Sequence, residues 1–178
     1  MNCDRSGYVE EKIYTDDRVD WAANCKMVLS MSQRDLKTSG NKILGNFPNA
    51  YCYSKRMAEH LLVLNNSTNI PLVLLRPSVV GTAANEPMPG WTDSIGILQG
   101  VSLIVGMGIL RDLPGKRDNI ADIIPVDFVT RHILASAAYL DAQNQANGQR
   151  LLVTHCASSS VNPCTWNTFF TSVTKYQN

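Results

Sequence analysis

The sequence lacks a strong charge of either sign. Its 178 residues include 16 basic and 15 acidic residues, and they contain no arginine-rich run. A chain without a net field has no electrostatic reason to bind nucleic acid or an anionic membrane as its main partner. We therefore expect no nucleic-acid partner.

Cysteine is scarce and dispersed. The five cysteines form no C-x-x-C pair, which favours reduced thiols in an intracellular compartment over a disulfide framework. His155-Cys156 has no second ligand pair at a zinc-like spacing. We expect no metal, and we interpret this dipeptide as a strand end with a buried thiol.

A long hydrophobic run is also missing. The uncharged stretch from Ser94 to Leu110 is shorter than the about 20 residues that a membrane span needs. Gly96 and Gly100 have the spacing used in membrane helix packing, but Gln99 and Ser102 dilute the hydrophobicity. The pattern predicts a buried or pocket-lining helix rather than a span.

No glycine-rich dinucleotide-binding motif precedes Tyr51. Such a motif follows the first strand and opens the helix whose N-terminus meets the pyrophosphate. Gly106-Met107-Gly108 begins the pattern, but Arg111 stands where the third glycine should be. We interpret it as a chance match.

The hydrophobic pattern alternates between helix and strand periods, which indicates an α/β fold. It predicts helices over residues 16–36, 50–64, 125–140 and 166–173, and strands over residues 70–75, 120–124 and 151–154. The strand at 70–75 is a continuous apolar run, typical of a parallel strand buried on both faces. Residues 39–41 and 45–49 are expected to be loops. Asn49 is a candidate cap for the second helix, and Asn162 or Thr165 for the last.

Tyr51 and Lys55 stand four residues apart in a predicted helix, so they share one helix face. A phenol ordinarily has a pKa of about 10 and donates its proton more readily when an ammonium stabilises the phenolate. The two residues could form such an acid pair. The same spacing fits an ordinary amphipathic helix whose tyrosine packs and whose lysine is solvated.

Four segments occur in order along the chain: 49–55, 75–80, 86–91 and 122–127. Together with residues 7–14 and 158–166, they resemble the alcohol-forming fatty acyl-CoA reductases, a branch of the extended short-chain dehydrogenase/reductase superfamily. The resemblance runs over nearly the whole chain. It implies a partial Rossmann-like parallel sheet with helices that lacks the N-terminal βαβ half, plus a small substrate-binding region.

The resemblance also implies roles for particular residues. Tyr51 would be the general acid, and Lys55 would hold the nicotinamide ribose of NADPH and lower the pKa of the phenol. The residues expected against the nicotinamide are Pro77, Ser78, Val79 and Val80, and those expected to bound the acyl pocket are Pro87, Pro89, Gly90 and Trp91. The substrate would be a long-chain acyl-CoA, reduced to a fatty alcohol through the aldehyde.

By the same resemblance, residues 1–85 would be the later part of a dinucleotide-binding domain and residues 86–178 a substrate-binding region. Residues 119–141 would pack back on the Rossmann core, where Asp127 favours the helix dipole. The family also has a serine or threonine shortly before the residues that match Asn2, so the sequence is expected to be a fragment. A fragment would expose a sheet edge or an apolar helix face.

The expected location is intracellular. For the parent protein, the cytosolic face of a membrane organelle is a further possible location. Membrane association would depend on parts that this sequence does not contain. Two other interpretations stay open: a carrier-protein thioester reductase of the same superfamily and a truncated, non-catalytic interaction module. A nucleotide-sugar epimerase is disfavoured by the Pro89-Gly90-Trp91 loop and by the lack of a charged sugar-diphosphate clamp.

Overall fold

A computed structural model describes residues 9–14, 19–66 and 70–175. Within these ranges, six helices are interspersed with four strands, which confirms the predicted α/β class. They are α1 (Trp21–Ser30), α2 (Gln33–Leu44), α3 (Ala50–Leu64), β1 (Leu72–Pro77), β2 (Val79–Gly81), α4 (Ile97–Gly106), β3 (Ile123–Pro125), α5 (Val126–Asn147), β4 (Leu151–Cys156) and α6 (Trp166–Thr174).

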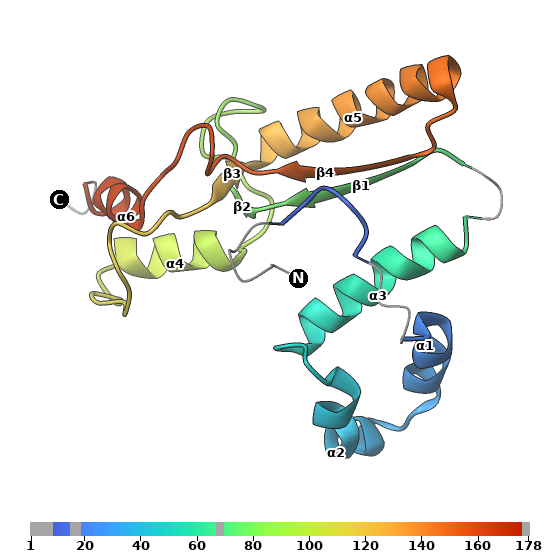
Figure 1. The fold of residues 1–178 in the computed structure, drawn as a ribbon. Coiled ribbons are helices and arrows are strands. Elements are labelled where there is room, and N and C mark those ends of the chain that lie inside the picture. The colour runs from blue at the N-terminus through green and yellow to red at the C-terminus, as the bar shows by residue number, and fades with distance from the viewer. Residues whose placement is uncertain (1–8, 15–18, 67–69, 176–178) are drawn as a thin grey trace.

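The strands form two small parallel sheets, as expected of a partial Rossmann-like fold. β1 pairs with β4, from Leu72 beside Leu151 to Pro77 beside Cys156, and β2 pairs with β3. Parallel strands need a long crossover connection. The chain returns to β4 through α5, which contacts both β1 and β4 and lies along them (Figure 1).

β1 is less buried than its apolar run predicts. Leu74 is buried, but the neighbouring residues of the strand are half-buried, and Ile70 just before the strand is 62% exposed. A strand buried on both faces needs a wide sheet covered by helices on each side. In the described chain β1 has one partner strand, so the prediction of full burial on both faces is wrong.

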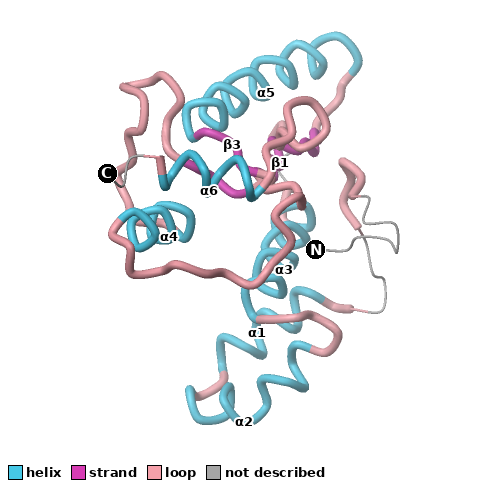
Figure 2. Tube along the Cα trace, turned by 90° about the vertical axis from the view of Figure 1, so that its left-hand side faces the viewer, coloured by secondary structure: helices cyan, strands magenta, loops and turns pink. Residues whose placement is uncertain are grey.

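A separate hydrophobic cluster holds α1, α2 and α3 together, on the other side of β1 and β4 from α5 (Figures 1 and 2). Its buried members are Trp21, Tyr53 and Met57. The Trp21 ring lies 6.1 Å from the Phe47 ring in a T-shaped arrangement and 5.7 Å from the Tyr53 ring. These aromatic contacts fix one face of α3 against α1.

The predicted helix over residues 16–36 is two helices. Ser32 adopts an extended backbone, and its hydroxyl accepts a hydrogen bond from the Asp35 N–H, so a new helix begins at Gln33. The prediction of a loop at residues 39–41 is wrong, because these residues lie inside α2. A glycine within a helix, such as Gly40, lowers the stability of the helix by only about 1 kcal/mol relative to alanine. The helix ends at Gly45, whose φ of 54° is a conformation that glycine adopts readily.

The later elements follow the predictions with changes at their ends. The strand expected at 120–124 is β3, which begins three residues later and ends one residue later, and Ile120 instead forms an isolated bridge with Thr165. Pro125 precedes α5, which continues to Asn147, seven residues beyond the predicted end. Side-chain hydrogen bonds one turn apart, from Gln145 to Asp141 and from Asn147 to Gln143, support this extension.

Apolar helix surface is exposed in several places, as expected. The clearest cases are Leu62 and Leu64 on α3, Ile97 on α4, and Ile133 and Leu134 on α5. Among the described helices, none combines the length and apolar character needed to cross a bilayer.

Candidate active site

The start of α3 positions the predicted acid pair. Asn49 has an extended backbone, and its side-chain oxygen accepts a hydrogen bond of 2.8 Å from the Cys52 N–H. This cap satisfies one of the unpaired N–H groups of the first turn, so the helix begins at Ala50. Tyr51 therefore lies in the first turn and Lys55 in the next.

Tyr51 and Lys55 lie together, as their spacing predicts. The Lys55 ammonium nitrogen is 5.6 Å from the centre of the Tyr51 ring. Tyr51 is 67% exposed, so its hydroxyl is accessible from outside the chain. An ammonium at this distance from the ring centre makes a cation–π contact, which holds the two side chains together.

The segment 77–80 lies at the carboxyl end of β1, where ligands bind in parallel sheets. The Ser78 N–H donates to the Cys156 carbonyl at 3.0 Å, and the Val79 N–H donates to the Asp122 carbonyl at 3.0 Å. These bonds hold the turn between β4 and β3. The four residues predicted to face a nicotinamide are thus contiguous with the sheet end, and none of them hydrogen-bonds to Tyr51 or Lys55 in the described chain.

The Ser78 hydroxyl is buried and has no hydrogen-bond partner among the described residues. Leaving a buried hydroxyl unpaired costs free energy, and such groups in native proteins call for an explanation. A polar ligand group at this sheet end would supply the missing partner. The carboxamide of a nicotinamide has both a donor and an acceptor, so the residue present fits such a group.

Asp127 holds the segment that follows β2. It is 5% exposed, and its carboxylate accepts hydrogen bonds from the N–H groups of Ala84 at 2.9 Å, Asn85 at 3.0 Å and Glu86 at 3.3 Å. These bonds, led by that of Ala84, lower the pKa of the Asp127 carboxyl. The predicted helix-start role is confirmed, but nothing in the sequence pattern indicated the contact with residues 84–86.

The Pro-Gly-Trp loop folds back on Ala83. The Gly90 N–H donates to the Ala83 carbonyl at 2.8 Å, and the Ala83 N–H donates to the Trp91 carbonyl at 2.9 Å. Gly90 has a φ of 82°, which favours glycine. Pro87, Pro89, Gly90 and Trp91 line neither of the two main cavities, so their assignment to the acyl pocket stays a prediction.

Two cavities touch α4, as expected of a pocket-lining helix: Val105 lines the larger one, and four residues from Leu98 to Leu103 line the smaller one. The larger cavity, of about 530 Å³, is lined by Val105, Gly108, Leu110, Arg111, Asp112, Leu113, Arg117, Asn167, Phe170, Thr171 and Thr174. The smaller, of about 380 Å³, is lined by Thr82, Thr92, Leu98, Gln99, Ser102, Leu103 and Phe169. Thr82 directly follows β2, so the smaller cavity lies close to the sheet end. The contribution of α6 to both cavities was not predicted.

Cys156 is the buried last residue of β4, which confirms the interpretation of His155-Cys156 as a strand end with a buried thiol. Burial raises the pKa of the Cys156 thiol. Across the described ranges, no three side chains of the metal-binding types come together.

Comparison with known proteins identifies similar chains. A family model described as male sterility protein, an NAD-binding domain, matches residues 1–133. Fatty acyl-CoA reductase 1 of Xenopus laevis is 33% identical over 165 residues, which cover 93% of this chain and 31% of the relative. Human fatty acyl-CoA reductase 1 is 35% identical over 125 residues, or 70% of this chain and 24% of the relative.

Human fatty acyl-CoA reductase 2 is 36% identical over 126 residues, or 71% of this chain and 24% of the relative. The chain thus spans less than a third of the length of each of these relatives. The matched NAD-binding domain indicates a nicotinamide dinucleotide cofactor.

Proposed function

This chain belongs to the family of male sterility proteins and fatty acyl-CoA reductases, and we propose that it forms part of an NADPH-dependent reductase of long-chain acyl-CoA. Its share of the site is the proton donor, the surface against the nicotinamide and the walls of the acyl pocket. The accessible Tyr51 with the Lys55 ammonium beside its ring is the observation that carries this proposal.

Tyr51 would donate a proton to the carbonyl oxygen as that oxygen gains negative charge. Lys55 would favour this donation because its charge stabilises the phenolate that remains. One bound NADPH would supply the hydride that reduces the thioester to an aldehyde, with release of CoA thiolate, and a second NADPH would supply the hydride that reduces the aldehyde to an alcohol. Protein side chains cannot supply hydride themselves. Ser78 would hold the nicotinamide by pairing its buried hydroxyl with the carboxamide.

The acyl chain would lie along α4. The smaller cavity begins at Thr82, beside the sheet end, and Leu98, Leu103 and Phe169 give it apolar walls. A long alkyl chain is stabilised by such surface at roughly 25 cal/mol per Å² removed from water. The Pro87 to Trp91 loop, which Asp127 holds through residues 84–86, would close this side of the pocket.

The nucleotide phosphates would bind a glycine-rich segment that is absent from this sequence. We therefore propose that catalysis belongs to a longer protein that contains this chain. The small share of each relative that the chain covers supports this proposal. The 178-residue chain by itself is expected to bind NADPH weakly or not at all.

The test is a hybrid reductase in which this chain replaces the aligned segment of the Xenopus laevis relative, which matches 93% of the chain. We expect palmitoyl-CoA to cause loss of NADPH absorbance and mass spectrometry to detect the alcohol. A folded hybrid that binds NADPH but does not oxidise it with palmitoyl-CoA would overturn the proposal. Turnover only with an acyl carrier protein thioester would instead select the carrier-protein reductase.

Calorimetric titration tests the need for a glycine-rich segment separately. The isolated chain and the hybrid reductase are titrated with NADPH under the same conditions, and only the hybrid is expected to bind tightly. Micromolar binding by the isolated chain would show that the phosphates need no further segment.

A further inference from the structure

Arg76, in β1, makes a two-pronged ion pair with Glu59 on α3. Its Nε and Nη2 atoms donate to the two carboxylate oxygens of Glu59 at 2.7 and 2.8 Å. The side chains are 15% and 21% exposed, so water screens the pair less than it does a surface pair. A planar guanidinium that binds both carboxylate oxygens has a fixed geometry. The pair therefore constrains how α3 lies against β1.

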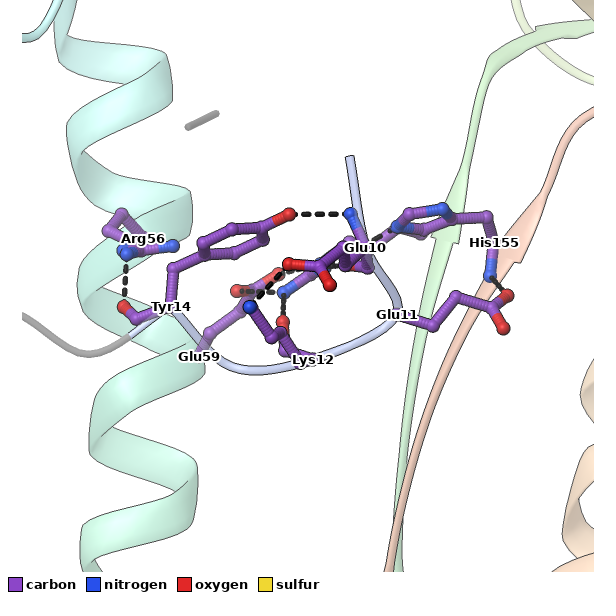
Figure 3. A network of polar contacts seen from close by, with 8 residues as sticks. Glu10, Glu11, Lys12, Tyr14, Arg56, Glu59 and His155 are labelled. Carbon is purple, nitrogen blue, oxygen red and sulfur yellow. Dashed lines mark hydrogen bonds and ion pairs between the residues drawn. The ribbon is translucent and has the colours of Figure 1, made fainter. Parts of the chain in front are cut away.

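The same guanidinium holds the segment of residues 9–14, which runs between α3 and the strands (Figure 3). Arg76 donates to the Glu10 carbonyl at 3.4 Å and to the Lys12 carbonyl at 3.0 Å. Its Nη1 atom also lies 3.4 Å from Nε2 of His155 on β4. One side chain thus meets α3, β4 and the N-terminal segment.

Further bonds tie this segment on both of its sides. The Glu11 carboxylate accepts hydrogen bonds from the His155 N–H at 2.6 Å and from the Thr154 hydroxyl at 3.2 Å, both on β4. On the other side, the Arg56 guanidinium of α3 donates to the Tyr14 carbonyl. Residues 9–14 therefore brace α3 against the β1–β4 sheet.

Glu59 continues the helix stripe that carries the proposed acid pair. Tyr51, Lys55 and Glu59 follow at intervals of four residues, and each interval turns the helix by about 40° beyond a full turn. The three side chains therefore share one side of α3. Tyr53 and Met57 project from the other side into the cluster with Trp21.

We propose that Arg76 is a positioning residue of the reductase, an inference that rests on the proposed function. By holding Glu59, it sets the rotation of α3 about its own axis and keeps the stripe of Tyr51 and Lys55 turned toward the end of β1. Ser78 follows Arg76 by two residues and comes directly after β1, so the anchor and the proposed nicotinamide contact lie next to each other at the end of this strand. Arg76 acts through Glu59 and does not itself touch the substrate.

The first experiment compares Arg76→Lys with Arg131→Lys in the hybrid reductase. Lysine keeps the charge of Arg76 but loses the two-pronged geometry. Arg131 forms an exposed ion pair of 3.1 Å with Glu86, with side chains 51% and 69% exposed, so it is the matched control. We expect Arg76→Lys to lower kcat by about 10- to 100-fold, as for a small misplacement of the acid, and Arg131→Lys to leave it unchanged.

A positioning role is separated from a merely structural one by two further readouts. We expect the KM for palmitoyl-CoA to stay within about 2-fold in Arg76→Lys, because the pocket walls are untouched. Glu59→Gln should lower kcat similarly, and the double variant should lose little more than either single one, because both break one interaction. An unchanged kcat per folded molecule in Arg76→Lys would overturn the proposal.

The second experiment needs no catalysis and uses the 178-residue chain. Hydrogen exchange should become faster over residues 9–14 and along α3 in Glu59→Gln, but not in Glu86→Gln, which breaks the exposed pair. If the wild-type hybrid has no turnover, the proposed function fails. The exchange rates in Glu59→Gln still decide whether the Arg76–Glu59 pair holds residues 9–14 and α3 against the β1–β4 sheet. Unchanged exchange in Glu59→Gln would overturn the positioning inference.

Discussion

Tyr51 and Tyr53 lie on opposite sides of α3, although only one residue separates them in the sequence. Tyr51 is 67% exposed, whereas Tyr53 is 8% exposed and lies 5.7 Å from the Trp21 ring. Burial is the main cause that raises the pKa of the Tyr53 phenol, so this tyrosine stays protonated at neutral pH. Of the two phenols, only Tyr51 is available to an external substrate.

The first prediction follows from this difference. In the hybrid reductase, Tyr51→Phe should lower kcat by about 10²- to 10⁴-fold, the usual contribution of a general acid, while NADPH binding stays nearly unchanged. Tyr53→Phe, the matched control, should keep most of the turnover. Steady-state kinetics and calorimetric titration measure both quantities, and retained turnover in Tyr51→Phe would remove Tyr51 from the acid role.

The second prediction concerns the unpaired hydroxyl of Ser78. Ser78→Ala should raise the free energy of unfolding of the isolated chain by about 1 kcal/mol, because it removes a buried polar group without a partner. In the hybrid reductase, the same change should weaken NADPH binding. Urea unfolding and calorimetry provide the two measurements.

Ser158→Ala is the control for this prediction. The Ser158 hydroxyl donates to the Ile123 carbonyl at 3.0 Å, so its removal should lower the free energy of unfolding. A stability loss in Ser78→Ala equal to that in Ser158→Ala would mean that the Ser78 hydroxyl is already satisfied within the chain.

The third prediction is a pH dependence caused by Asp127. Three backbone N–H donors hold the pKa of this carboxyl below its ordinary value, so the unfolded chain binds more protons than the folded chain in the acid range. The stabilisation is fully present above the unfolded pKa of about 3.9 and is lost as the pH falls through the lower folded pKa. Asp127→Asn should therefore be less stable near neutrality, and its stability should change less in acid.

Urea unfolding at a series of pH values tests this prediction, with Asp141→Asn as the control. Asp141 lies on the same helix but is exposed and accepts a hydrogen bond only from Gln145 among the side-chain contacts described. Its variant should follow the wild-type curve. If Asp127→Asn also follows that curve, the carboxylate does not stabilise residues 84–86 through its charge.

The fourth prediction tests the cluster around Trp21. Trp21→Ala should lower the free energy of unfolding by about 3–5 kcal/mol, since it leaves a cavity between Phe47, Tyr53 and Met57. Leu29→Ala, at a position 81% exposed on the same helix, should change it by less than about 0.5 kcal/mol. If Trp21→Ala prevents folding, Trp21→Phe should still show a smaller loss; equal stability of all variants would contradict the cluster.

Features coded by neighbouring residues could be predicted from the sequence. The cap at Asn49, the bounds of α3, the strand β4 and the Thr165 cap of α6 depend on side chains within one turn or on one apolar run. The pairing of Tyr51 with Lys55 depends on helix geometry alone. Local signals were therefore sufficient to predict the part of the candidate site that α3 carries.

Contacts between distant segments could not be predicted. Nothing in the short apolar pair Ile123-Ile124 indicates that it lies beside Val79 and Val80, and Asp127 meets residues 84–86 only because β2 and β3 are adjacent. The Arg76–Glu59 pair likewise depends on how α3 lies against β1. Tertiary packing decides these contacts, and a single sequence carries no local pattern for it.

The pairing of β1 with β4 has a consequence for synthesis on the ribosome. The members of the Trp21 cluster all lie between Val19 and Leu61, so that cluster can form early in the nascent chain. Leu72, in contrast, pairs with Leu151, and β1 must wait for the intervening residues to be translated. During that interval the backbone groups of β1 that later bond to β4 have no partner strand. An unpaired apolar strand is prone to aggregate, so we expect chaperones to bind the emerging chain at this stage.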